Sequence, residues 1–583
     1  MSNSLFRTKK ISSILAEGSD DAHGGGGGLH RVLTVRDLTF FGIAAILGAG
    51  SFSSLGGAVF NGGPGVVLLF IITAIACGFT AFCYSEFASR IPVAGSAYTY
   101  AYASFGELFA WIIGWALIME YSIGNIYVAF SWSDYFTSFL TKLGVDIPAW
   151  LSTSYMEAKD GIMSGSTNAE VISAWSNAPV IAGLRFIVDV PALVINLLIS
   201  YLVYRGIKES RNFSNVMVIL KMAVVALVIL VGGYLVFANG LTPNWMPADD
   251  AGVNNFMPNG FSGVMAAVSG VFFAYIGFDA VSVLAEESKN PQRDLPRGMM
   301  YSLVICTIVY ILLTLVLSGA VNYRNFQGVG DPLAFIFEKQ NLNVGWMQIL
   351  VAISAVIAMT SVLLVFQMGQ PRIWMSMSRD GLLPPVFQKI HPKYKTPSFA
   401  TIITGFVVGV PILFTDKTFV LDFTSIATLF AFVLVCGGVL LIPRKEKMEG
   451  KFHLPYINGQ FIFPAIILIA IALLGIYIKG YWQNLLNFDF SSNADYTSGK
   501  ISFLDAATPQ ITLIIFWGIC VILAVISFIK KYSLIPLMGL STCLYLLTGM
   551  TKNNWAWFLG WLALGLIVYF LYGYKKSKLA TPQ

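Results

Sequence analysis

The chain has 583 residues, of which 56% are hydrophobic and only 11% are charged. A soluble domain carries roughly 25% charged residues, and a globule with a mean hydropathy of +0.72 would expose far too much apolar surface to water. The composition also excludes a disordered chain and a secreted disulfide scaffold. We therefore predict an all-α polytopic membrane protein.

Cysteine and histidine residues are placed where they cannot form a metal site. The six cysteines all lie inside apolar runs and no two have CxxC spacing, so they are typical of small buried hydrophobic residues. The four histidines all lie outside the apolar runs. We therefore expect no metal ion and no cofactor. The first 36 residues are polar and lack the pattern of a cleavable signal peptide.

Fourteen apolar segments follow a polar N-terminal tail, residues 1–36. The tail contains five consecutive glycines, Gly24–Gly28, which are typical of a flexible tether. Each later segment is near the roughly 20 residues that a spanning helix needs, and continuous apolar runs exclude a β-barrel. The segments are 38–60, 64–88, 106–140, 181–204, 213–238, 261–285, 298–321, 345–377, 399–416, 419–443, 461–481, 510–530, 533–550 and 555–574.

The distribution of positive charge predicts the orientation of these helices. With the N-terminus in the cytoplasm, cytoplasmic segments hold 26 of the 36 Lys and Arg residues, outer segments hold 9, and Lys221 lies within a helix. Cytoplasmic loops are generally enriched in Lys and Arg. We therefore predict a plasma membrane protein with an even number of spans and with both termini in the cytoplasm.

The first and the sixth predicted helices contain glycines near their centres. Segment 38–60 contains Gly48 and Gly50, and segment 261–285 contains Gly277. Glycine weakens a helix interior, and paired broken helices mark the binding site of transporters that are built from inverted repeats. The alternative is that these glycines only allow helices to pack closely. We predict that helices 1 and 6 are both broken.

The two breaks lie five helices apart, which predicts the domain organisation. A repeat with an odd number of helices inverts its second copy, so we expect inverted repeats at about 37–238 and 261–443. Together they form a transporter core at 37–443. Residues 444–583 then contain four accessory helices and a cytoplasmic C-terminus.

Three ionisable residues lie near the middle of predicted helices: Glu120 in the third, Lys221 in the fifth and Asp279 after the break in the sixth. A charge at that depth is costly, so each residue needs a partner, a neutral form or a water-filled cavity. The alternative for each is a static buried ion pair. By default, ionisable groups at this depth indicate function.

Several motifs around these residues resemble the amino acid–polyamine–organocation superfamily, and specifically its cationic amino acid transporter family. They are GIAAILGAG at 42–50, FFAYIGFD at 272–279, GQPR at 369–372 and SRDGLLP at 378–384. The resemblance covers helices 1–10, whereas helices 11–14 match only in number and hydropathy. It implies the leucine-transporter type of fold, with 5+5 inverted repeats and about 14 transmembrane helices.

Within that fold, the broken helices imply a site for the backbone-like part of an amino acid. Free amides near Ala49 and Gly50 begin a half-helix whose dipole favours a carboxylate, and freed carbonyls suit an α-ammonium. We expect Gly50→Val to abolish binding while folding stays intact. The family usually has a hydroxyl or small residue at position 49 and an aliphatic one at 51, so Ser51 is a departure. The implied substrate-binding residues are Ile46, Ala49, Gly50, Ser51, Phe273, Ala274, Ile276 and Asp279.

Two further residues are candidates for proton coupling. Lys221 resembles the helix-5 lysine whose ammonium, in proton-coupled relatives, takes the place of a sodium ion. Burial disfavours its charged form, whereas carbonyls of the helix-1 break near Ile43 and Ala44 favour it. Glu120 is the second candidate, because it lies on an adjacent helix.

The resemblance implies a secondary active amino acid permease that moves L-amino acids by alternating access and is coupled to protons as a symporter. Its expected partners are an amino acid, a proton and the lipid bilayer, with no nucleic acid. An amino acid exchanger without strict proton coupling and a sensor that binds without transport remain alternatives. An enzyme is not expected, because no His or Cys lies at membrane depth beside a base and no nucleotide motif is present.

Overall fold

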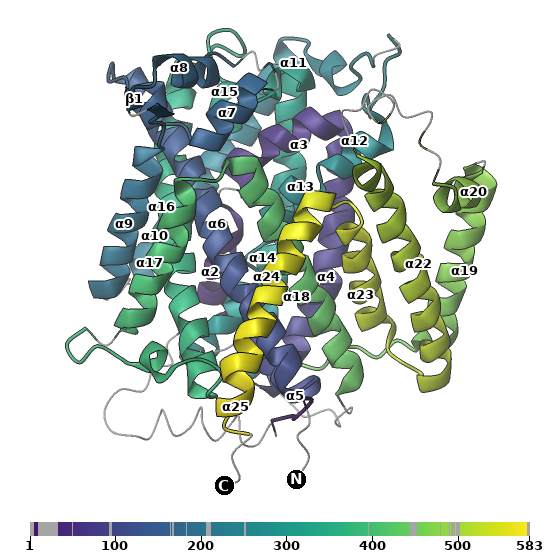
Figure 1. The fold of residues 1–583 in the computed structure, drawn as a ribbon. Helices are drawn as coiled ribbons and strands as arrows, with labels where there is room; N and C mark the ends of the chain where they lie inside the picture. Colours follow the sequence, from purple (N-terminus) through teal and green to yellow (C-terminus); the bar gives the residue numbers. More distant parts are fainter. Residues whose placement is uncertain are drawn as a thin grey trace.

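The computed structural model is a bundle of helices that run in nearly the same direction (Figure 1). It describes residues 5–9, 33–48, 50–91, 96–163, 165, 168–181, 183–205, 211–249, 252–394, 396–442, 452–478, 480–488, 490, 496 and 502–579. A small hairpin of β1 (Val180–Ile181) and β2 (Leu184–Arg185) pairs Val180 with Arg185 and Ile181 with Leu184. The fold is therefore helical almost throughout the described residues, as predicted.

The first half of the bundle contains α2 (Val35–Ile46), α3 (Leu55–Gly62), α4 (Val66–Arg90), α5 (Ser96–Ser104), α6 (Glu107–Lys142), α7 (Tyr155–Met163), α8 (Ala169–Asn177), α9 (Val190–Arg205), α10 (Arg211–Leu227), α11 (Gly233–Ala238), α12 (Gly260–Ala266) and α13 (Val268–Tyr275). The second half contains α14 (Pro291–Ala320), α15 (Pro332–Phe335), α16 (Gly345–Arg379), α17 (Ser398–Ile412), α18 (Lys417–Leu441), α19 (Gly459–Tyr477), α20 (Tyr481–Leu486), α22 (Phe503–Lys530), α23 (Leu534–Leu547), α24 (Lys552–Val568) and α25 (Tyr574–Lys576).

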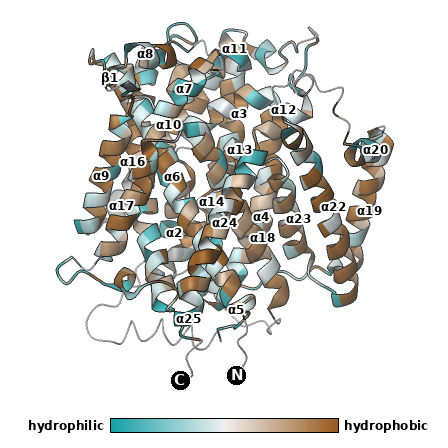
Figure 2. Ribbon diagram, in the orientation of Figure 1, coloured by the Kyte–Doolittle hydropathy of each residue, from teal (hydrophilic) through white to brown (hydrophobic). Residues whose placement is uncertain are grey.

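The helices that face outward are apolar along their length. Figure 2 shows hydrophobic colour along α9, α19 and α22, with hydrophilic colour concentrated at the two ends of the bundle. Within the described ranges, nine helices are long and apolar enough to cross a membrane, or up to ten if a bent pair counts as one span. Three shorter apolar helices, α9, α17 and α23, lie beside them. The protein is therefore a multi-pass membrane protein, while the count of fourteen spans remains a prediction.

Both predicted helix breaks are present. Helix α2 ends at Ile46, and a π-helical turn at Gly50–Ser54 leads into α3. Helix α13 ends at Tyr275, and a 3₁₀-helix begins at Asp279. Between them Gly277 has a φ of +116°, a left-handed conformation that only glycine adopts readily. The sequence therefore locates both breaks correctly, because glycines at these points free the backbone from a helix.

The bundle has two distinct ends (Figure 1). One end, here called the terminal face, holds α5, α25 and both chain termini. The other end, called the opposite face, holds α7, α8 and α15. Helices α4, α6, α14, α16 and α18 surround α2 and α13, so the two breaks lie inside the largest hydrophobic core.

Candidate site at the helix breaks

The two broken helices meet at Gly50. A Cβ at position 50 would lie 2.5 Å from the Cα of Ala274, so any side chain there would push α13 away. This contact overturns our expectation that Gly50→Val spares folding, because a valine would disrupt the packing of one half-helix on the other. Gly277 is constrained in the same way, since its Cβ would lie 2.8 Å from the Cβ of Ala45. The glycines therefore serve both the breaks and the contact between them.

A small enclosed cavity of about 10 Å³ lies between the broken helices and two scaffold helices. Four predicted residues line it, and the other four were not predicted. Three of those lie in ordinary apolar runs, and Ala45 lies in the motif at 42–50 but was not assigned to the site. A water molecule needs roughly 10–15 Å³, so an amino acid enters only if the surrounding elements move. The predicted lining residues are Ile46, Gly50, Phe273 and Ile276, and the missed ones are Ala45, Val128, Val362 and Phe366.

The carbonyls of the two breaks are bridged by Tyr310 of α14. Its hydroxyl lies 2.8 Å from the carbonyl oxygen of Ile46 and 2.7 Å from that of Ala274. Both oxygens were predicted to receive a substrate ammonium. Tyr310 is buried in an apolar run of α14, where its sequence context gives no sign that it contacts the backbone of two other helices.

The remaining predicted residues at the helix-1 break differ in what they contact. Ala49 lies outside the described residues. Ser51 is fully buried, and its hydroxyl donates to the carbonyl of Gly48 at 2.9 Å. The same carbonyl also accepts from the backbone amides of Ser51 and Phe52, each at 3.1 Å, so the serine hydroxyl adds a local hydrogen bond at the start of the π-helical turn. Ser51 is absent from the residues that line the small cavity.

Lys221 of α10 binds the other side of the same break. Its ammonium donates to the carbonyl oxygens of Ala44 and Leu47, each 3.0 Å away, and the residue is 2% exposed. The predicted carbonyl of Ala44 is used, but that of Ile43 accepts from the amide of Leu47 instead. Lys221 therefore joins α10 to the end of α2.

Asp279 and Glu120 form a separate buried group beyond the helix-6 break. The Asp279 carboxylate accepts from the amide of Gly277 at 3.3 Å, so it contacts the break that precedes it. Glu120 of α6 lies within electrostatic range of Asp279 and beside Thr428 of α18. Both carboxyl groups are at most 4% exposed. Neither residue lines the small cavity, so this structure does not bring Asp279 together with the other predicted binding residues.

Aromatic and charged contacts close the site toward the opposite face. The rings of Tyr127 and Phe273 meet edge to face with centroids 4.5 Å apart. Above them, Lys417 at the start of α18 forms an ion pair with Asp134 of α6 and lies 5.7 Å from the Tyr127 ring. The Lys417 ammonium also reaches the carbonyl of Gly330 at 3.5 Å. These contacts connect α6, α13, α18 and the segment before α15.

Comparison with known proteins assigns the family. The sequence profile of the amino acid permease family matches residues 33–493. The branched-chain amino acid permease BcaP of Bacillus subtilis (strain 168) is 40% identical over 446 residues, which is 76% of this chain and 87% of BcaP.

Two other relatives show the breadth of the family. The methylthioribose transporter of the same organism is 37% identical over 460 residues, covering 78% of this chain and 89% of that protein. The vacuolar cationic amino acid transporter 2 of Arabidopsis thaliana is 30% identical over 638 residues, covering 99% and 94%. With its two broken helices and a matching profile over most of its length, the chain belongs to the amino acid permease family of the amino acid–polyamine–organocation superfamily.

Proposed function

We propose that the protein is a secondary active amino acid transporter that works by alternating access and is coupled to protons. The observation that carries this proposal is the buried ammonium of Lys221 on the carbonyls of Ala44 and Leu47. A bound cation there holds α10 against the helix-1 break. The ammonium of a lysine can serve as that cation, and it can also lose its proton and become neutral when its surroundings change.

Coupling follows from what the ammonium connects. When Lys221 is protonated, it fixes the end of α2 against α10 and keeps the half-helix that begins near Gly50 in place. When it loses its proton, the charge-assisted hydrogen bonds weaken and α10 can separate from α2. Proton release and substrate release are then linked, because both depend on the same helix-1 break. Glu120 of α6 and Asp279 after the helix-6 break serve as further carboxyl groups in this pathway.

The expected substrate is an amino acid with an aliphatic side chain. Val128, Val362, Phe366 and Ile276 are among the residues that line the small cavity, and none of its described lining residues is charged. A cationic side chain placed there would lose its hydration without gaining a carboxylate. The similarity to BcaP, a branched-chain amino acid permease, supports the same substrate class.

We also propose that the terminal face is cytoplasmic and that the membrane is the plasma membrane. The excess of Lys and Arg in the segments assigned to the cytoplasm supports this orientation. Both termini lie at one end of the bundle, which fits an even number of spans (Figure 1).

Uptake into proteoliposomes tests the proposal. We expect labelled leucine to accumulate when a pH gradient is imposed, with competition by isoleucine and valine but not by lysine or arginine. Uptake driven by sodium and indifferent to pH would contradict proton coupling. Exchange that requires amino acid inside the vesicles would favour the exchanger, and specific binding without flux would favour the sensor.

A further inference from the structure

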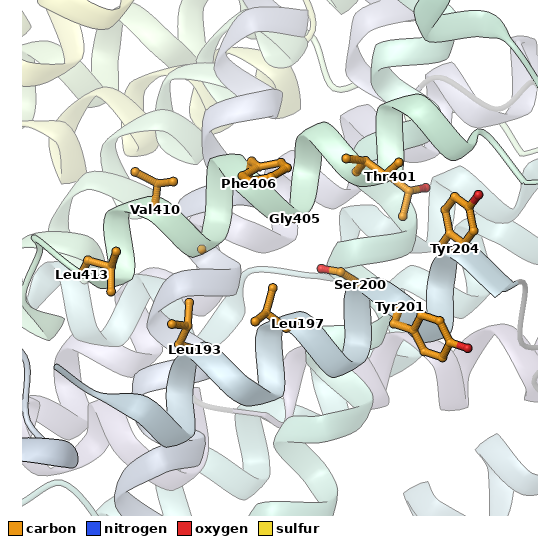
Figure 3. A pocket seen from close by; sticks show the side chains of 12 residues that line it. Leu193, Leu197, Ser200, Tyr201, Tyr204, Thr401, Gly405, Phe406, Val410 and Leu413 are labelled. Carbon is orange, nitrogen blue, oxygen red and sulfur yellow. The ribbon is translucent and has the colours of Figure 1, made fainter.

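Helices α9 and α17 pack against each other at the outer edge of the bundle (Figure 1). An apolar groove runs between them. It has a volume of about 420 Å³ and lies apart from the helix breaks. Figure 3 shows large side chains of both helices along it, with the hydroxyl groups of Tyr201 and Tyr204 at one end. The groove is lined by Leu193, Leu197, Ser200, Tyr201, Tyr204, Thr401, Ile402, Gly405, Phe406, Gly409, Val410 and Leu413.

Small residues form the floor of this groove. A Cβ at Gly405 would lie 2.9 Å from the Ser200 hydroxyl oxygen, and one at Gly409 would lie 2.9 Å from the amide nitrogen of Asn196. Helices α9 and α17 therefore approach closely along a line of small side chains, at a spacing that glycine allows. Thr401 continues this line, because it lies four residues before Gly405 on the same face of α17.

Large side chains form the two ridges. Leu197 and Tyr201 of α9 are 55% and 56% exposed, and Phe406 and Val410 of α17 are 64% and 49% exposed. Each pair is spaced by four residues, so the two members stand on one face of their helix. Two apolar ridges above a floor of small residues make a channel that offers only apolar contacts along the two helices.

The end of the groove at the terminal face is aromatic and basic. Arg205, the last residue of α9, donates to the Tyr201 hydroxyl at 3.0 Å, and its guanidinium lies 5.2 Å from the ring of Tyr394. The ammonium of Lys393 lies 5.6 Å from the centroid of the same Tyr394 ring. Both cations are exposed. In α9, α17 and the described segment 381–394, every Lys, Arg, Asp or Glu is basic: Arg205, Lys389 and Lys393.

We propose that this groove binds one anionic phospholipid, with an acyl chain between α9 and α17 and the phosphate at Arg205 and Lys393. The apolar lining excludes water at membrane depth, so hydrocarbon is the occupant that the bilayer offers. The basic end selects among lipids, because exposed arginine and lysine at the membrane interface attract anionic headgroups. Tyrosine is enriched at the same interface. The lipid holds α9 and α17 together along their outer edge.

Native mass spectrometry of the purified full-length protein tests this site. The probes are phosphatidylglycerol and phosphatidylcholine with the same acyl chains. We expect wild-type protein to retain one phosphatidylglycerol with at least about tenfold higher affinity than phosphatidylcholine. Arg205→Gln with Lys393→Gln should remove that preference. The matched control is Lys530→Gln with Lys575→Gln, which removes two exposed cations elsewhere and should leave binding unchanged.

A second pair of variants tests the acyl-chain position. Leu197→Trp fills the groove and should lower retention of phosphatidylglycerol, whereas Leu198→Trp changes an equally exposed neighbour outside the groove and should not. Equal retention of both lipids by wild type, or equal effects of the two tryptophans, would overturn the proposal. Displacement of the lipid by glycerol 3-phosphate would also overturn it, because that result indicates an anion site without an acyl chain. A dimer that Leu197→Trp abolishes would overturn it too, because the groove would then be an interface between two copies of the chain.

Discussion

At the scale of single residues, Lys221 has the clearest functional consequence. Two charge-assisted hydrogen bonds to Ala44 and Leu47 hold its buried ammonium, and each such bond contributes roughly 1.5–3 kcal/mol. We expect Lys221→Ala to remain folded but to lose pH-driven accumulation by roughly tenfold or more, without gaining dependence on sodium. Proteoliposome uptake under separate pH and sodium gradients measures this. Lys339→Ala, at an exposed lysine, is the control; normal pH-driven uptake by Lys221→Ala would reduce the residue to a structural role.

Tyr310 contacts both helix breaks, and the sequence did not predict this role. Because its hydroxyl bridges the carbonyls of Ile46 and Ala274, Tyr310→Phe leaves buried acceptors with fewer donors, at a cost of about 1–3 kcal/mol. We expect a lower melting temperature and slower uptake. Tyr301→Phe on the same helix is 52% exposed and should change stability by less than about 0.5 kcal/mol. Equal melting temperatures for the two variants would show that the bridge contributes little.

At the scale of elements, the sequence predicted the breaks better than their contacts. Glycines at 48, 50 and 277 are local signals, so the ends of α2 and α13 follow from backbone preference alone. The residues of the cavity wall cannot be predicted in the same way. Val128 and Phe366 lie on helices that are apolar on every side, so the sequence does not show which face turns toward the cavity. Which face turns inward depends on packing among distant helices, and that information is not local.

The ion pair of Lys417 with Asp134 fastens α18 to α6 at the opposite face. Its side chains are 18% and 30% exposed, so we assign it only about 0.5–1 kcal/mol. Maleimide labelling of the variant Ser53→Cys reports the opening of that face. Ser53 is 4% exposed and its hydroxyl donates to the Gly330 carbonyl, so a thiol at this position is covered while the face is closed. The native cysteines are buried and give little background. Lys417→Ala should raise the rate of maleimide labelling roughly two- to fivefold.

A charge reversal is the control for this pair. Asp134→Lys combined with Lys417→Asp should bring the labelling rate of Ser53→Cys back toward that of the unmodified pair, since the attraction is restored with opposite polarity. If Lys417→Ala and the reversed pair label at the same raised rate, the contact with the Tyr127 ring matters more than the ion pair.

Low pH should favour the closed form of the same face, because it protonates Asp331. This half-buried carboxylate precedes α15 and accepts from the Ser138 hydroxyl at 2.8 Å. Burial, with the charges of Glu338 and Asp134 nearby, raises its pKa to about 6. An open face exposes the carboxyl to water and returns its pKa toward the ordinary value, so protonation favours the closed form. Between about pH 7.5 and pH 5, labelling of Ser53→Cys should slow, and Asp331→Asn should weaken that dependence.

At the scale of the whole molecule, the two ends of the chain meet on one buried carboxylate. Glu107, the first residue of α6, is fully buried and accepts from the Arg7 guanidinium at 3.3 Å and from the Tyr569 hydroxyl at 3.0 Å. Ser577 donates to its other oxygen at 2.5 Å, and the Tyr102 hydroxyl lies 3.2 Å from that oxygen. Glu107 therefore joins the N-terminal segment, α5, α6 and the C-terminal turn.

Loss of this carboxylate should release both ends of the chain. Glu107→Ala leaves the Arg7 charge without its acceptor, and breaking a buried pair costs about 3–5 kcal/mol. Arg7 and Lys9 are only 14% and 11% exposed at their side chains, so trypsin should cut the wild-type protein slowly after Arg7. In Glu107→Ala we expect faster cleavage there and a lower melting temperature, with Glu107→Gln intermediate because its amide oxygen still accepts from hydroxyls. Glu157→Ala, at an exposed glutamate of the opposite face, is the control. Unchanged cleavage in Glu107→Ala would mean that Lys9 and its ion pair with Asp380 are enough to hold the N-terminal segment in place.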